Sequence, residues 1–432
     1  MFGFAYPPAV DSQAIVVRAG RVLDVRNGEL TGPRSIFVRE GNIEKIADAG
    51  PEPDGVTVID LSDRTVLPGL MDMHAHLIGE PDSGHGYVGL VARTPAQEAF
   101  SGVHNARATV MAGFTTVRDV GTFRSFVDVD LKDAIERGFV EGPRMACAGA
   151  YVTVSGGGGD VSGLAVDVVI PKDLRFGVAN SAAEVRRVVR EILQRGADFI
   201  KVIATGAVLT EGTNPGAPEY SEEELRAAVE EAAIYGKHVA AHAHGAEGIK
   251  RAVRAGVRSI EHGSLMDDEA IDLMAEHGTY LVADIYCGDW IAEEGRRAGW
   301  SEATLRKNDE TTDAQRAGFE KAVGAGVKIA FGTDSGVYPH GLNARQFAYM
   351  VRYGMTPTEA VRAATLTAAE LLGWEDRVGC IEDGKAADLI AVDGDPTEDP
   401  ACLERVDFVM KAGEVLKDKL ARLRPDGSPP SD

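Results

Sequence analysis

The chain has 432 residues, and its 45 basic and 67 acidic side chains give a formal net charge of −22 at pH 7. Nucleic acids and anionic membrane surfaces attract basic proteins, so this acidic balance disfavours both as partners. The apolar runs are shorter than the ~20 residues that span a bilayer, and the N-terminus lacks a basic segment followed by an apolar one. We therefore expect a soluble, cytoplasmic protein that acts on a small molecule.

Strand and helix patterns divide the chain into zones. Residues 1–65 and 376–420 alternate apolar and polar side chains in short runs separated by turns, which is typical of β-strands. Residues 66–375 alternate eight apolar strand candidates with amphipathic helix candidates that end on glycine. Eight such alternations over ~250–300 residues are typical of a (β/α)8 TIM barrel. We predict this barrel, a small β-sandwich domain built from both termini, and a flexible tail at 421–432.

Histidines are concentrated where the predicted barrel strands end. His74 and His76 close the first strand, His242 and His244 the fifth, and His262 the sixth. The C-terminal ends of barrel strands meet on the face that carries the active site. Histidines two residues apart leave the same face of a strand, so each pair can reach one ion. A half-buried pair in the core is the alternative for either pair taken alone.

Lys201 and Asp334 also lie in predicted barrel strands or at their ends. Lys201 is in FIKVI, where a buried ammonium costs several kcal/mol unless it is paired or neutralised. Burial lowers the pKa of a lysine, and a neutral amine can take up carbon dioxide to form a carbamate that bridges two metals. A salt bridge with a carboxylate is the alternative. Asp334, in TDSG, can bind a metal and accept a proton from water, or cap a helix.

Segments along the whole chain, such as VLPGLMDMHAHL, HAHGAEGI and GKAADLIAVDGDP, resemble the metal-dependent amidohydrolase superfamily. Within it, the chain is most similar to imidazolonepropionase-like dipeptidases and carboxypeptidases and to ochratoxin-hydrolysing amidohydrolases. The resemblance implies a homo-oligomeric hydrolase with two divalent metal ions, usually Zn²⁺. It also implies a set of metal ligands: His74, His76, carboxylated Lys201 as the bridge, His242, His262 and Asp334.

The resemblance further assigns catalytic and substrate-binding roles. Asp334 would take a proton from the attacking water and pass it to the leaving amine, while His244 would polarise the substrate carbonyl. Tyr151, Tyr338 and His340 are expected to line the same pocket. Gly158 lies in a glycine-rich loop, 155–160, where related dipeptidases often have a histidine. Its small size suggests room for a bulkier acyl group.

The predicted function is hydrolysis of an amide or peptide bond next to a free carboxylate. Dipeptides, N-acyl amino acids and ochratoxin-like amides are the expected substrates. One alternative is a cyclic amide hydrolase or deaminase of the imidazolonepropionase type, which uses the same metal site. Another is a non-catalytic metal-binding barrel. Residues 284–312 form either a substrate-covering wall or a packed insertion.

Several other polar residues are expected to have structural roles. Arg118 and Asp119 are predicted to form an ion pair with each other at the end of the second strand. Four histidines are predicted to lie on the surface or behind the site: His85, His104, His238 and His277.

Overall fold

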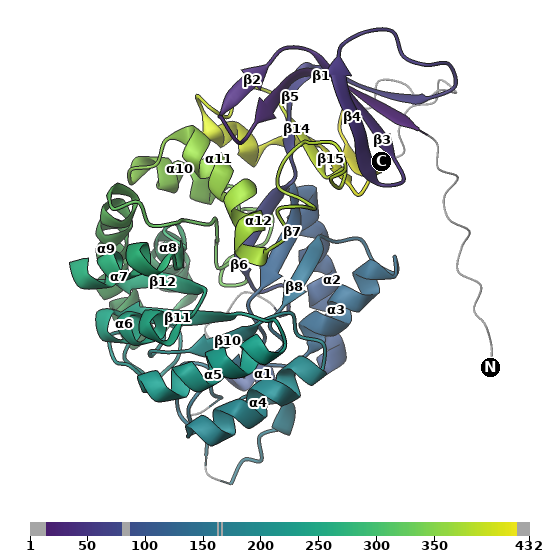
Figure 1. The fold of residues 1–432 in the computed structure, drawn as a ribbon. Helices are drawn as coiled ribbons and strands as arrows, with labels where there is room; N and C mark the ends of the chain where they lie inside the picture. The colour runs from purple at the N-terminus through teal and green to yellow at the C-terminus, as the bar shows by residue number, and fades with distance from the viewer. Residues whose placement is uncertain (1–13, 80–86, 162–163, 166, 421–432) are drawn as a thin grey trace, which may run out of the picture.

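The computed structural model describes residues 14–79, 87–161, 164–165 and 167–420. A β-rich unit made from both ends of the chain lies beside a larger unit of alternating strands and helices, which we call the α/β body (Figure 1). The predicted tail at 421–432 and His85 lie outside the described residues. Among the described helices, none is both long and apolar enough to cross a bilayer.

The β-rich unit is one eight-stranded sheet in the order β16-β15-β14-β5-β1-β3-β4, with β2 paired to β1. Strand β5 pairs with β1 on one side and β14 on the other, so it joins the two ends of the chain. Hydrogen bonds therefore connect all these strands in one continuous sheet, and the sandwich arrangement of this unit stays a prediction. The strands are β1 (Ile15–Asp24), β2 (Glu29–Thr31), β3 (Arg34–Arg39), β4 (Asn42–Asp48), β5 (Thr57–Pro68), β14 (Leu389–Val392), β15 (Val406–Lys411) and β16 (Glu414–Asp418).

Strand β5 leads directly into the first strand of the α/β body, β6 (Leu70–Ala75). Gly69, between them, lies so close to β7 that a Cβ atom would be 2.0 Å from the Thr115 hydroxyl. This approach requires glycine and lets the chain pass from one sheet to the next without a loop. The predicted boundary at residue 65 therefore falls inside β5.

The α/β body contains parallel strands whose spatial order follows the chain. One sheet has the order β6-β7-β8 and the other β13-β12-β11-β10-β9. Parallel bridges from Leu281 to Ile329 and from Ala75 to Ser335 place residues 329–335 between β13 and β6. The further strands are β7 (Phe114–Asp119), β8 (Arg144–Cys147), β9 (Tyr151–Val152), β10 (Ile200–Ile203), β11 (Val239–Gly245), β12 (Ser259–Leu265) and β13 (Tyr280–Val282).

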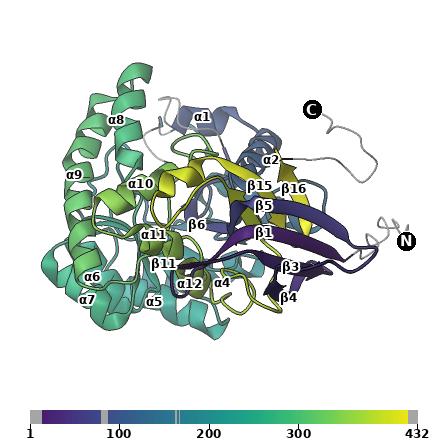
Figure 2. The same ribbon diagram turned by 90° about the horizontal axis from the view of Figure 1, so that it is seen from above.

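Helices cover the outer side of these strands, and α8 and α9 lie side by side at one edge (Figure 2). Side-chain caps fix where several begin; Ser181 and Ser221 each accept a hydrogen bond from a first-turn backbone N–H. The helices are α1 (Tyr87–Ala92), α2 (Pro95–Met111), α3 (Val127–Glu136), α4 (Ala182–Gln194), α5 (Glu222–Ile234), α6 (Ala246–Ala255), α7 (Asp268–His277), α8 (Cys287–Ala298), α9 (Glu302–Gly324), α10 (Arg345–Arg352), α11 (Pro357–Ala363) and α12 (Leu366–Leu372), with short 3₁₀ turns at Lys172–Arg175 and Pro400–Glu404.

Phe331 connects three parts of the core. Its ring is fully buried and lies 5.5 Å from the ring of Phe114 on β7 and 4.5 Å from that of Phe347 on α10. Phe331→Ala is expected to lower the free energy of unfolding by about 3–5 kcal/mol because it removes apolar contacts and leaves a cavity. In contrast, Phe100→Ala on α2 should change it by less than about 0.5 kcal/mol, because this ring is exposed. Urea unfolding of both variants checks this, and equal losses would contradict it.

Candidate active site

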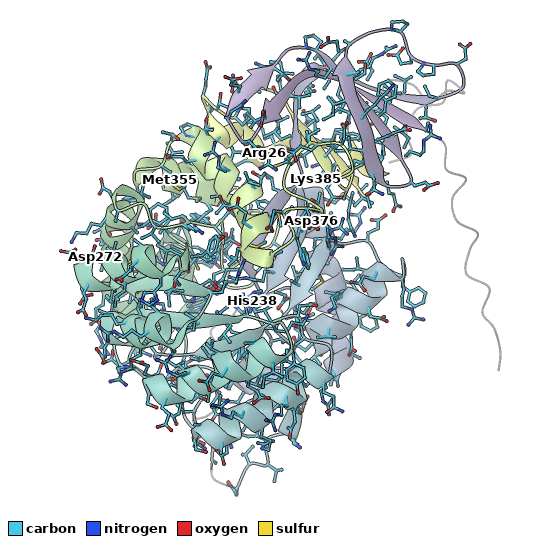
Figure 3. The ribbon with its side chains drawn as sticks, viewed as in Figure 1. Arg26, His238, Asp272, Met355, Asp376 and Lys385 are labelled. Carbon is cyan, nitrogen blue, oxygen red and sulfur yellow. The ribbon has the colours of Figure 1, made fainter. Side chains whose placement is uncertain are left out.

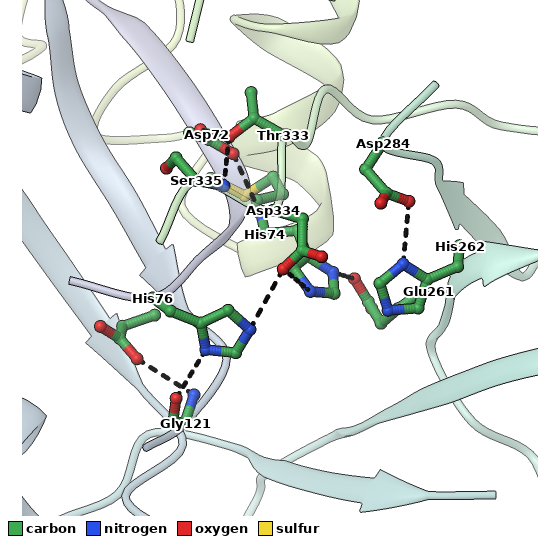
Figure 4. A network of polar contacts seen from close by, with 12 residues as sticks. Asp72, His74, His76, Gly121, Glu261, His262, Asp284, Thr333, Asp334 and Ser335 are labelled. Carbon is green, nitrogen blue, oxygen red and sulfur yellow. Dashed lines mark hydrogen bonds and ion pairs between the residues drawn. The ribbon is translucent and has the colours of Figure 1, made fainter. Parts of the chain in front are cut away.

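His74 and His76 present the same ring atom to Asp334 (Figure 4). The Nδ1 atom of His74 donates to the Glu261 carboxylate at 2.8 Å, and that of His76 donates to the Gly121 carbonyl at 2.7 Å. Their Nε2 atoms lie 3.5 and 3.3 Å from Oδ1 of Asp334. Because Nδ1 carries the proton in both rings, the neutral tautomer leaves the Nε2 lone pair available to a metal.

Three more imidazoles form a second cluster beside the first. The ring centroids of His242, His244 and His262 lie 4.5–4.8 Å apart, and His74 is 4.7 Å from His262. The Nδ1 atom of His262 hydrogen-bonds to Asp284 at 2.8 Å. Strands β11 and β12 pair in parallel, which brings these rings together.

The backbone is strained where two of the predicted ligands lie. His262 and Asp334 have φ values of +67° and +58°, a region that residues other than glycine rarely adopt. Such conformations persist only where the surrounding structure imposes them, and they occur preferentially at functional sites. His262 lies within β12, and Asp334 directly precedes Ser335, which bridges to Ala75; both side chains point toward the imidazole cluster (Figure 4).

The donor atoms of these residues are close enough to hold cations. Within three groups of side chains, the potential donor atoms all lie within 4.8 Å of one another. Imidazole nitrogens and carboxylate oxygens are ligands that zinc accepts, so the residues fit a metal centre. The groups are His242, His244 and His262; His74, His262 and Asp334; and Asp284, Cys287 and Asp334.

Lys201 lies on β10 at the floor of the same region. Its side chain is 2% exposed, and among the described residues its Nζ atom has no hydrogen-bond or ion-pair partner. Burial lowers the pKa of this amine to about 8. The salt bridge left open by the sequence is therefore absent from the described contacts, and much of the amine is neutral near pH 8, as carbamate formation requires.

A cavity of about 520 Å³ opens over these groups. All the predicted metal ligands line it, as do His244, Tyr151 and Gly158. A Cβ atom at Gly158 would lie 3.0 Å from the Ile203 side chain and 3.2 Å from the Thr205 carbonyl, so a larger residue would require these neighbours to give way by a few tenths of an ångström. The Gly158 N–H donates to the Glu219 carboxylate, whose pKa burial raises to about 7.

Tyr338 and His340 are not among the described residues that line this cavity. Tyr338 is fully buried and packs its ring 5.2 Å from that of Tyr286. His340 faces the His76 carbonyl at 3.1 Å, behind the site. The bridge between Ser335 and Tyr338 turns the chain back after Asp334, which directs both side chains away from the cavity. Their predicted substrate contacts are therefore not supported.

Arg118 pairs with Glu261 on β12. The predicted ion pair between Arg118 and Asp119 is therefore wrong. Its guanidinium donates to both Glu261 oxygens at 2.7 and 2.8 Å, and both side chains are fully buried. Asp119 instead accepts from the backbone N–H groups of Leu77 and Gly121. The reason is strand geometry, because adjacent residues of β7 point to opposite faces.

Asp284 and Gln315 are site residues that the sequence interpretation missed. Asp284 follows β13, and its Oδ1 atom accepts from His262 and, at 2.9 Å, from the amide of Gln315 on α9. Burial raises the pKa of Asp284, but nearby His262 outweighs this and holds it below the usual value. A carboxylate directly after an apolar strand is the signal that identified Asp334, and it applies equally to Asp284.

The insertion at residues 284–312 contributes both to the cavity and to packing. Several residues of α8 and α9 line the cavity: Gly288, Ile291, Asn308, Thr311, Thr312 and Gln315. Trp300, by contrast, is 6% exposed and packs within the helix pair. His104 and His277 are exposed, and His238 precedes β11 at the strand end away from the cavity, stacked on Phe199 (Figure 3).

The fold and the cavity are those of an α/β enzyme with a candidate metal centre. Residues 65–416 match the model of the Amidohydrolase family, and the chain belongs to this family. Membership implies a TIM barrel for the α/β body and a hydrolase that acts on C–N bonds. The family is generally metal-dependent, which agrees with the donor groups described above.

Three similar proteins illustrate this relationship. An ochratoxinase from Aspergillus niger is 33% identical over 370 residues, covering 82% of this chain and 75% of the relative. An imidazolonepropionase from Micrococcus luteus is 25% identical over 397 residues, covering 85% and 89%. The crystal structure of a Xaa-Pro dipeptidase with methionine in its active site is 41% identical, with a TM-score of 0.86, covering 94% of this chain and all of the other.

Glu261→Gln tests the buried contact behind His74. Among the described hydrogen-bond partners of Arg118, Glu261 carries the only formal charge, and the variant removes it. We therefore expect a loss of about 3–5 kcal/mol in the free energy of unfolding. Glu141→Gln makes the same chemical change in an exposed pair with Arg107 and should cost less than about 1 kcal/mol. Thermal or urea unfolding of the metal-free proteins compares them. Similar losses in the free energy of unfolding for the two variants would show that burial does not increase the contribution of the Arg118–Glu261 pair to stability.

Proposed function

We propose that the chain is a binuclear metal-dependent amidohydrolase that cleaves an amide bond between an acyl group and an amino acid with a free carboxylate. Dipeptides, N-acyl amino acids and ochratoxin-like amides belong to this class. One observation carries the proposal: histidines from three strands, Asp334 and an unpaired buried lysine face one cavity. The similarity to an ochratoxinase and a Xaa-Pro dipeptidase supports the choice of substrate class.

In the proposed centre, His74, His76 and Asp334 would hold one ion, and His242 and His262 would hold the other. Lys201 is expected to bridge them as a carbamate. The α/β body, residues 66–375, is inferred to close into a complete (β/α)8 barrel, because residues 329–335 bridge to the strands on either side. Closure places the ligands of both ions at one end of the strands.

When bound, the ions, which we expect to be Zn²⁺, would lower the pKa of a bound water molecule and would polarise the substrate carbonyl. Asp334 is the proton carrier: His74 and His76 hold its pKa well below the usual value against the effect of burial. It therefore starts as a carboxylate, takes the proton from the attacking water and delivers it to the leaving nitrogen.

His244 orients the carbonyl. Burial lowers the pKa of its imidazole to about 3, so the ring is neutral at physiological pH. Its Nδ1 atom faces the Ser264 hydroxyl at 2.8 Å, which fixes the ring and leaves the other nitrogen to the substrate. A neutral N–H donor in this place stabilises negative charge as it develops on the carbonyl oxygen.

Chelation tests whether metals are required. Treatment of the protein with a chelator should abolish hydrolysis of a panel of dipeptides and N-acyl amino acids, and added Zn²⁺ should restore it, because the water has to be activated. Metal analysis in parallel should give two ions per chain. Inclusion of imidazolone-type cyclic amides in the panel tests the alternative substrate class. A protein with two bound ions that hydrolyses no member of the panel would contradict the proposal.

Lys201→Ala tests the bridging ligand. We expect the variant to lose bound metal and at least about 100-fold in kcat/KM, since two ions would share no anionic bridge. Added propionate should recover part of the metal content by supplying a carboxylate. Lys321→Ala, which removes an exposed lysine paired with Asp268, is the matched control and should behave as wild type. Full metal content and activity in Lys201→Ala would rule out the bridging role.

A further inference from the structure

A row of aromatic rings extends from the metal ligands along the cavity wall. It begins at His76 and continues through Tyr151 and Phe123 to Tyr87 on α1. Successive ring centroids are 6.1, 5.2 and 5.6 Å apart, each pair in edge-to-face contact. All four residues line the cavity. We call Tyr151, Phe123 and Tyr87 the aromatic row.

The rings of the aromatic row are only partly buried, unlike the aromatic residues of the core. Tyr151 is held in place by its hydroxyl, which donates to the Gly121 carbonyl at 2.9 Å, and by Gly121 itself, where a Cβ atom would meet the ring at 2.8 Å. Phe123 has no polar group to satisfy. Its open face is apolar surface that a ligand would remove from water.

Among the described residues that line the cavity beside the row, the two arginines, Arg93 and Arg124, are already neutralised. Arg93 pairs with Glu98 at 2.7 Å, and Arg124 pairs with Asp173 at 2.9 Å. The guanidinium of Arg124 also donates to the carbonyls of Leu90 and Arg93. This part of the cavity therefore offers apolar rings and compensated charges. A charged substrate group placed against these rings would lose hydration, and the two paired arginines would not compensate it.

We propose that the aromatic row is a binding subsite for an uncharged aromatic acyl group. The inference rests on the proposed function and narrows its substrate class. An N-acyl amino acid has one charged half, the amino acid carboxylate, and one uncharged half, the acyl group. The uncharged half matches the aromatic row, and its carbonyl then lies at the His76 end, beside the metal ligands. Free dipeptides are poorer substrates because their ammonium group would occupy this subsite.

Two pairs of substrates test the subsite on the zinc-loaded protein. N-(2-naphthoyl)-L-alanine carries its rings on the acyl half, and N-acetyl-3-(2-naphthyl)-L-alanine carries them on the amino acid half; N-acetyl-L-alanine and glycyl-L-alanine are the small references. Wild type should hydrolyse the naphthoyl amide with the highest kcat/KM. Phe123→Ala should lower that value by roughly 10- to 100-fold and that for N-acetyl-L-alanine by less than about three-fold.

Two further variants serve as controls. Phe123→Leu keeps an apolar side chain but removes the aromatic ring, so it should retain the fold while still losing the preference for the naphthoyl group. Phe100→Ala removes an exposed ring on α2 outside the cavity and should leave all four substrates unchanged. Circular dichroism and metal content show whether each variant is intact.

The outcomes separate this inference from the proposed function. If Phe123→Ala lowers kcat/KM equally for the naphthoyl and acetyl substrates, the subsite is refuted while amide hydrolysis stands. A selective loss on N-acetyl-3-(2-naphthyl)-L-alanine instead would refute the assignment of the acyl half to the row. If zinc-loaded wild type hydrolyses none of the four, the proposed function fails and the subsite falls with it.

Discussion

The carboxylate of Glu261 is shared between a buried cation and a metal-facing histidine. Its oxygens accept from Arg118, from the Ser259 hydroxyl and from Nδ1 of His74, and the ion pair is fully buried. Burial raises the pKa of Glu261, but Arg118 and His74 outweigh this and keep it ionised. A buried charge is tolerated only when such partners are complete. The position of His74 is thus fixed by an interaction that the interior of the α/β body cannot lose without a large cost.

The same arrangement recurs around the site with different partners. The Gly121 carbonyl holds Nδ1 of His76, and Asp284 holds Nδ1 of His262. Each contact orients a ring and determines which nitrogen is protonated, so the opposite nitrogen is left for a ligand. Because these partners come from different strands and from the loops that follow them, the geometry of the centre depends on the whole body and not on any single motif.

The cavity joins two environments that suit the two halves of an amide substrate. One end has imidazoles, carboxylates and a buried lysine, where charge can be stabilised. The other has the half-buried rings of Tyr151, Phe123 and Tyr87 beside paired charges. In the glycine-rich loop, a Cβ atom at Gly158 would lie 3.0 Å from the Ile203 side chain and 3.2 Å from the Thr205 carbonyl, so a histidine there would require these neighbours to move by a few tenths of an ångström.

The sequence by itself determined the alternation of strands and helices and the union of both ends of the chain in one β-rich unit. It also determined which residues at the strand ends, among them His74, Lys201 and Asp334, meet at the cavity. These follow from local periodicity and from the rule that strand ends share one face. Only the tertiary structure decided that Arg118 pairs with Glu261, that Asp284 and Gln315 support His262, and that Tyr338 and His340 turn away. Such contacts join residues from separate elements, and which residues meet depends on strand register and on the direction of each turn. Neither is encoded in the local pattern of polar and apolar residues.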